Sequence, residues 1–309
     1  MPTRTHAGVV LLFAVFGISW AAPLIRLSTA PPLVIAAWRL CIAEAVLLAI
    51  LAQRKEWRAW QQLPRHDHQL AAAAGGMLAL HFWSWNASLG YTTVAASVVL
   101  VNLQPAIVAA GSALLLRERA TARQVAGLAI GIAGALLVAV PGFTATPVSS
   151  AQALSAPLGM PPQLFGDLLA LLGALTASIY YLVGRRLRAT MALVPYVSLV
   201  YGWCTLVLLA LVIVTGAPLA PYPPADWAIF AGLAAGPMLL GHTGMNWALR
   251  FLPAHVVNLT VLGEPVGAAT LAMLIPAIGE RPDAWTLAGG ALILGGAIWA
   301  MGGRSDGDG

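Results

Sequence analysis

The sequence is poor in charge. Only 9% of its 309 residues are Asp, Glu, Lys or Arg, whereas a soluble domain carries roughly a quarter. Hydrophobic residues make up 60% of the chain, and the mean hydropathy is +0.83. This composition excludes an ordinary soluble domain and indicates an integral membrane protein, with the lipid bilayer as its surroundings.

Motifs that carry chemistry are also scarce. The two cysteines, Cys41 and Cys204, lie inside apolar runs and offer neither a disulfide framework nor metal-ligand spacing. There is no His-Glu-x-x-His motif, and the Gly-x-x-x-Gly spacings lack the Lys-Ser/Thr of a phosphate-binding loop. Basic residues form no long run. We therefore expect no metal, no cofactor, no drive by ATP and no nucleic-acid partner.

Long apolar segments are abundant. A helix needs about 20 apolar residues to cross the hydrocarbon core, and ten segments meet this requirement. The sequence therefore predicts an all-α integral membrane protein with ten transmembrane helices. The predicted spans are residues 7–25, 32–52, 70–90, 94–116, 124–140, 164–184, 191–215, 227–249, 254–277 and 284–302.

Basic residues are distributed unequally between the two sides of this topology. With a cytoplasmic N-terminus, the outer segments hold only Arg26 and Arg281. Because Lys and Arg concentrate on the cytoplasmic side, we predict a multi-pass protein of the bacterial inner (plasma) membrane with both termini cytoplasmic. The inner segments hold Arg4, Arg54, Lys55, Arg58, Arg65, Arg117, Arg119, Arg123, Arg185, Arg186, Arg188, Arg250 and Arg304.

The two halves of the chain share a pattern. The stretch 86–89 followed by Pro105 matches 246–249 followed by Pro265, and the glycines after each Glu-Arg pair also correspond. Five spans in each half would place the halves upside down relative to each other, which is the inverted repeat of many transporters. We predict a first five-helix repeat at 1–140, a periplasmic linker at 141–163, a second repeat at 164–303 and a cytoplasmic tail at 304–309.

The chain resembles the EamA type of the drug/metabolite transporter superfamily. The residues that carry the resemblance are Trp38-Arg39, Glu264-Pro265, and Glu-Arg followed by spaced glycines at 118–134 and 280–296. The resemblance implies two five-span repeats, export of amino acids or other metabolites, and fifth and tenth spans that can form a dimer contact. A monomer and a homodimer both stay open. One departure is Gln104, where the family often has Glu before the proline.

Polar residues next to prolines mark two places in the apolar runs. Asn102 and Gln104 precede Pro105, and Glu264 precedes Pro265. At the depth of the bilayer centre such groups are tolerated where they line a cavity. Glu264 can accept a proton, bind a cationic group, or hydrogen-bond a neighbouring helix.

Aromatic and weakly polar residues extend this candidate site. They predict a nearly neutral aromatic cavity for amphipathic solutes, although Trp20 and Trp85 also fit an interfacial aromatic belt. With Asn102, Gln104 and Glu264, the candidate substrate-binding residues are Trp20, His81, Trp85, Tyr180, His242 and Asn246. Pro105, Pro237 and Pro265 are the candidate kinks for gating, and Arg39 and Glu44 are interpreted as a structural ion pair.

The resulting hypothesis is a secondary-active or facilitative transporter that exports small-molecule metabolites by alternating access, with aromatic or large neutral amino acids as the preferred class. One alternative is a proton-coupled exporter of cationic drugs or other metabolites. Two other classes stay open: an intramembrane metalloenzyme built on His81, His242 and Glu264, and a channel. Saturable counterflow in vesicles separates a carrier from a channel, and metal analysis tests the enzyme.

Overall fold

The computed structural model describes residues 4–88, 90–92, 97, 100–144, 160–278 and 284–301, and within these ranges it contains helices and no strand. The first half combines four long helices with three short ones among the described residues. They are α1 (Arg4–Ser19), α2 (Ala21–Leu27), α3 (Pro32–Gln53), the short α4 (Arg58–Gln61), α5 (Arg65–Ser88), α7 (Gln104–Gly111) with the π-helical η1 (Ser112–Leu116), and α8 (Ala122–Thr144).

The second half also combines long helices with shorter segments. Two long helices are followed by two that change their winding along their length, and by a final straight one. These are α9 (Pro162–Arg188), α10 (Leu193–Thr215), α11 (Pro224–Leu233) with the π-helical η3 (Ala234–His242) and α12 (Thr243–Ala248), then α13 (Ala254–Leu259) with the 3₁₀ segment η4 (Thr260–Gly263) and α14 (Glu264–Leu274), and α15 (Ala284–Met301).

Proline and glycine place several of the helix boundaries. Pro32, Pro162 and Pro224 occupy the first turn of α3, α9 and α11, where a missing N–H costs nothing because it would have no partner within the helix. At the end of α10, Gly216 adopts φ +65°, a left-handed conformation that glycine accepts without strain. The residues at these positions therefore determine the helix boundaries without help from distant parts of the chain.

Five helical stretches are long and apolar enough to cross a membrane by length and composition. Their windows have mean hydropathies between 1.3 and 2.5. Among the other predicted spans, α5 is more polar, and α7 and α13–α14 are divided into short segments within the described residues. α8 and α15 are uninterrupted apolar helices. The five stretches are His6–Leu27, Pro32–Gln53, Pro162–Arg188, Leu193–Thr215 and Pro224–Ala248.

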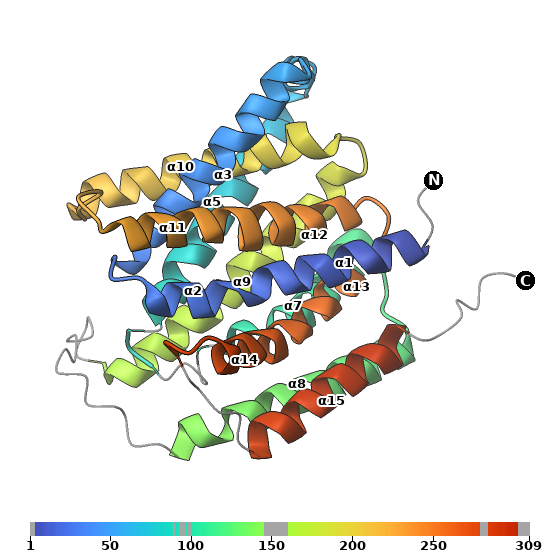
Figure 1. Ribbon diagram of the computed structural model, residues 1–309. Helices are drawn as coiled ribbons and strands as arrows, with labels where there is room; N and C mark the ends of the chain where they lie inside the picture. Colours follow the sequence, from blue (N-terminus) through green and yellow to red (C-terminus); the bar gives the residue numbers. More distant parts are fainter. Residues whose placement is uncertain are drawn as a thin grey trace, which may run out of the picture.

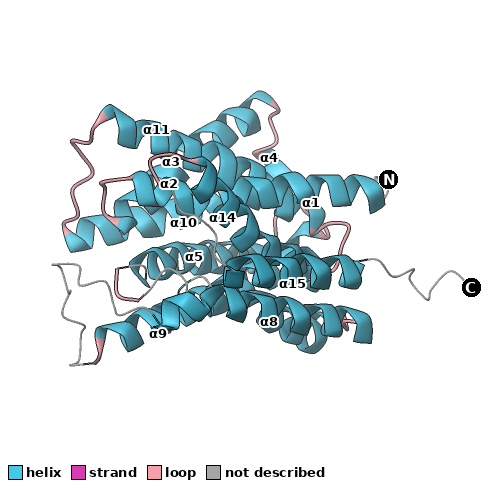
Figure 2. Ribbon diagram, turned by 60° about the horizontal axis from the view of Figure 1, so that its bottom comes forward, coloured by secondary structure: helices cyan, strands magenta, loops and turns pink. Residues whose placement is uncertain are grey.

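The helices lie roughly along one direction and pack as a bundle with one separate pair (Figure 1). In the main body α5 packs against α9 and α10, α10 against α3, and α1 against η3, α12 and α14. α7 packs against α9 and α13. α8 and α15 lie side by side at the edge, joined to the body through η4 and α14 (Figures 1 and 2).

Glycine explains how closely α8 and α15 approach each other. A Cβ atom added to Gly127 would lie 2.5 Å from the carbonyl oxygen of Gly296, and one added to Gly134 would lie 2.6 Å from that of Gly289. Such distances are impossible for real side chains, so only glycine permits this backbone contact. The glycine pattern on these helices thus serves packing within the chain.

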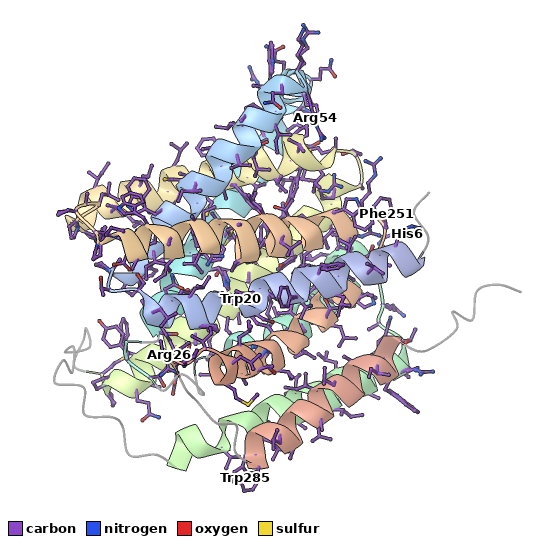
Figure 3. The ribbon with its side chains drawn as sticks, in the orientation of Figure 1. His6, Trp20, Arg26, Arg54, Phe251 and Trp285 are labelled. Carbon is purple, nitrogen blue, oxygen red and sulfur yellow. The ribbon has the colours of Figure 1, made fainter. Side chains whose placement is uncertain are left out.

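Both ends of the chain lie at the same end of the bundle. α1 begins and α15 ends on the right in Figure 1, and Figure 2 agrees. His6 and Phe251 lie at this end, whereas Arg26 lies at the opposite one (Figure 3). Of the predicted linker 141–163, residues 141–144 belong to α8 and 162–163 to α9. Residues 145–159, Arg281 and the predicted tail lie outside the described ranges.

Candidate functional site

The two polar-proline stretches form matching departures from regular helix. Before α7, residues 102 and 103 form a turn, and Leu103 and Ala106 donate to carbonyls three residues earlier. Before α14, the 3₁₀ segment η4 does the same. Gln104 and Glu264 are the first residues of α7 and α14. The two residues therefore occupy matching positions, each directly after a tightly wound stretch.

The prolines in these stretches occupy the first turns of α7 and α14 rather than helix interiors. Helical backbone angles continue through Leu103 into α7 and through η4 into α14, so both prolines lie where the winding changes along a helical segment. The role of Pro105 and Pro265 as gating kinks stays a prediction. Both prolines lack the N–H that would reach the carbonyls of Val101 and Val261. Pro237 differs because it lies inside the π-helical η3, where the wider winding accommodates its ring.

A small cavity of about 40 Å³ lies where these elements meet. Its wall includes Arg39, Pro237 and both Val101 and Val261. Six of the predicted substrate-binding residues line it: His81, Trp85, Asn102, Gln104, His242 and Glu264.

Three predicted site residues do not line this cavity. Tyr180 and Asn246 are fully buried and bonded to each other. The Asn246 amide N–H groups donate to the Tyr180 hydroxyl and to the His242 carbonyl, whereas Asn246 Oδ1 has no hydrogen-bond partner among the described residues. Trp20 lies at the junction of α1 and α2, with its ring edge-on to Phe16 at 6.2 Å (Figure 3). The structure assigns these side chains to helix packing.

Two aromatic residues that the prediction did not include take part instead. Phe82 and Tyr181 both line the cavity. Tyr180 and Tyr181 are neighbours on α9, about 100° apart around the helix, so only one of them can face a given side. The sequence signalled a tyrosine here, but the packing of α9 against α5 and α12 selected Tyr181.

Stacked rings make up much of the wall. His81 and Trp85 lie parallel with centroids 6.2 Å apart, and Tyr181 stacks on His242 at 6.4 Å. Phe82 meets His242 edge-on at 5.4 Å. The His81 ring is held by the carbonyl of Gly173 at 2.9 Å. These contacts fix the rings and give this part of the cavity an aromatic wall.

Arg39 and Glu44 do not form the predicted ion pair. They lie five residues apart on α3, about 140° around the helix, so they face different neighbours. The Arg39 guanidinium lies 4.2 Å from the centre of the Phe82 ring and donates to the Met238 sulfur at 3.1 Å. Glu44 instead lies beside α10 at Gly202, with its Oε2 buried and without a hydrogen bond.

The side chains of Gln104 and Glu264 have different partners. The Gln104 side-chain amide donates to Asn258 Oδ1. The backbone carbonyl of Gln104 accepts from the Ser178 hydroxyl at 3.3 Å. Glu264 is half-buried and forms no hydrogen bond or ion pair with the residues that the structure describes. Arg39, which lines the same cavity, attracts the Glu264 carboxylate electrostatically without forming an ion pair with it.

No three His, Cys, Asp or Glu side chains come together as a metal site in the described ranges. His81, His242 and Glu264 share the cavity wall, but they do not converge on one point as an enzyme's metal set requires.

Comparison with known proteins gives matches over nearly the whole chain. The sequence model of the EamA-like transporter family matches residues 5–140 and 164–302. The Uncharacterized transporter YyaM of Bacillus subtilis is 23% identical over 269 residues, covering 86% of this chain and 83% of that protein. A solved structure titled "Crystal structure of protein" aligns with a TM-score of 0.77 at 22% identity, over 97% of this chain and 98% of that one.

Proposed function

The chain belongs to the EamA-like transporter family, and from this premise we propose that it carries aromatic or large neutral amino acids out of the cell by alternating access, as a secondary-active or facilitative transporter. The observation that carries the substrate class is the wall of stacked rings formed by His81, Trp85, Tyr181 and His242. A ring-bearing or bulky apolar side chain fits between such faces.

The architecture proposed for this transport is ten spans in two inverted five-span repeats. Helix contacts support it. In such a repeat, each span corresponds to the span five positions later, counting on from the tenth to the first, and two observed helix pairs obey this relation. The third–sixth pair (α5–α9) corresponds to the eighth–first pair (η3–α1). The fourth–sixth pair (α7–α9) corresponds to the ninth–first pair (α14–α1). The matching cavity positions Val101 and Val261 fit the same relation.

Contacts between the two halves at opposite ends of the bundle support an alternating cycle. At one end Arg185 of the second half donates to Glu118 of the first half at 2.7 Å. Arg185 also donates to the Leu249 carbonyl of its own half at 2.6 Å. At the other end Asp226 accepts from the Ser28 hydroxyl at 2.5 Å, and from the N–H and hydroxyl of Thr29. Opening either side of the cavity requires one of these sets to separate.

We place the protein in the bacterial inner membrane with both termini cytoplasmic, as a monomer or a homodimer. The start of α1 and the end of α15 lie at the same end of the bundle (Figure 1), which an even number of spans requires. Arg185 lies near Phe251 at that end (Figure 3). A basic cytoplasmic end agrees with the general charge rule for membrane proteins.

The test is uptake into proteoliposomes of radiolabelled tryptophan, phenylalanine, leucine and threonine, with and without a pH gradient. We expect saturable uptake of the aromatic amino acids and its loss in Trp85→Ala. The matched control is Trp285→Ala, because Trp285 lies at the exposed start of α15, away from the cavity. If no amino acid moves, the substrate proposal fails, and cationic drugs with Glu264 as counter-charge become the class to test.

A further inference from the structure

Arg39 is a buried cation with too few partners. The residue is 1% exposed, yet its Nε and Nη1 have no hydrogen-bond acceptor among the described residues. The contacts it does make are to the Met238 sulfur and the face of the Phe82 ring. Burying donors of a charged group without acceptors is costly. A charge in this condition at the wall of a cavity marks a place for an anionic group.

Trp85 has an unused donor at the same cavity. Its indole Nε1 is buried without an acceptor, and its ring is held by stacking on His81. Both Trp85 and Arg39 line the cavity, although they come from different helices, α5 and α3. A carboxylate accepts several hydrogen bonds at once, including the two parallel ones that a guanidinium offers.

Glu264 supplies the opposite charge. It lines the same cavity from α14 and forms no ion pair in the described part of the chain. A ligand with only a cation would leave Arg39 unmatched, and a ligand with only an anion would leave Glu264 unmatched. A zwitterion satisfies both groups, because its two charges are separated by one carbon atom and remain free to face different walls.

We infer that the cavity is a zwitterion site, in which Arg39 and the Trp85 N–H bind the carboxylate of an α-amino acid and Glu264 binds its ammonium group. The inference rests on the proposed function and adds to it the chemistry that selects free amino acids. The stacked rings would hold the side chain, while the three polar groups would hold the common backbone. Amines and simple acids with the same side chain would then bind less well.

Three phenylalanine-like ligands separate the two charges. L-phenylalanine carries both, L-phenylalaninamide keeps the ammonium alone, and 3-phenylpropionate keeps the carboxylate alone. We would measure their binding to the purified full chain in detergent by calorimetry. We expect Arg39→Gln to weaken L-phenylalanine and 3-phenylpropionate about tenfold or more and to leave L-phenylalaninamide unchanged. Glu264→Gln should weaken L-phenylalanine and L-phenylalaninamide and spare 3-phenylpropionate.

Two further variants guard against misfolding. Arg39→Lys keeps the charge but not the planar fork, so it should retain part of the carboxylate selectivity. Trp85→Phe keeps a ring and removes the N–H, and it should weaken only the two carboxylate ligands. The ratio of two ligands in one preparation does not depend on the yield of folded protein.

The outcomes distinguish this inference from the proposed function. If Arg39→Gln weakens all three ligands equally, or if the wild-type protein binds L-phenylalaninamide as tightly as L-phenylalanine, the zwitterion site is overturned while amino-acid uptake still supports the transporter. If the wild-type protein neither transports an amino acid nor binds L-phenylalanine, the proposed substrate fails first, and the zwitterion site fails with it.

Discussion

Gln104 at the start of α7 and Glu264 at the start of α14 occupy matching positions in the two halves of the chain. Each follows a tightly wound stretch, precedes a proline and lines the same cavity. Gln104 is held by Asn258 and Ser178, whereas Glu264 has no hydrogen-bond partner among the described residues. The same local structure therefore places a side chain that joins two helices, Gln104, in one half. In the other half it places a carboxylate, Glu264, that is available to a ligand.

Glu264→Gln should have the largest effect on transport. A hydrogen bond to a charged group contributes about 1.5–3 kcal/mol, so we expect the KM for phenylalanine to rise by about one to two orders of magnitude. The thermal stability of the detergent-purified protein should stay near that of the wild type, because the carboxylate makes no contact that the variant would break. A large drop in melting temperature would show that Glu264 is structural, like Gln104.

Gln104→Leu should show the opposite pattern. It removes the donor to Asn258 Oδ1, and the side chain of Asn258 is fully buried. The free energy of unfolding should fall by about 1–3 kcal/mol because that acceptor is left unsatisfied, with a smaller effect on KM. A double-mutant cycle with Asn258→Leu provides the control: the two losses should not add, since both variants remove one bond.

Gln104→Glu tests whether a glutamate at position 104, in the first half, can replace Glu264 of the second half in transport. The new carboxylate cannot donate to Asn258 Oδ1, and turning the Asn258 amide would break its bond to the Ala254 carbonyl, which is 3.0 Å long. The loss of stability should be about one hydrogen bond, roughly 1 kcal/mol. Combined with Glu264→Gln, this exchange should fail to restore uptake. Restored uptake would mean that the two positions are equivalent.

Pro105→Ala and Pro265→Ala should have the smallest effects. Both prolines lie in the first turn of a helix, so the replacement changes stability by less than about 1 kcal/mol, mainly through the unfolded chain. Equal, small shifts of the melting temperature would support the matching geometry of the two stretches. A loss of uptake in only one of them would show that the halves use their prolines differently.

Residues whose role depends on local chemistry could be recognised from the sequence. Polar groups beside prolines in apolar runs pointed to the cavity, and six of the nine predicted binding residues line it. The glycines that correspond between the two halves lie where α8 and α15 approach each other closely. Such signals survive because polar groups and small residues are costly or useless in lipid unless they meet a specific partner.

Other assignments depended on rotation about a helix axis and on neighbours far along the chain. Tyr181 rather than Tyr180 reaches the cavity because α9 is packed with one particular face toward α5 and α12. Arg39 meets Phe82 and Met238 instead of Glu44, although Glu44 is close in sequence. A helix turns by about 100° per residue, so sequence distance alone did not tell which side chains meet.

Composition and periodicity by themselves determined that this is a helical membrane protein, because water cannot solvate such apolar segments and lipid cannot satisfy an open backbone. The same signals located the polar residues of its centre. Only the tertiary structure decided that Gln104 is hydrogen-bonded to Asn258, while Arg39 and Glu264 line the cavity without an ion pair among the described residues. The physical reason is that a polar group's role in a membrane interior depends on whether another helix brings it a partner.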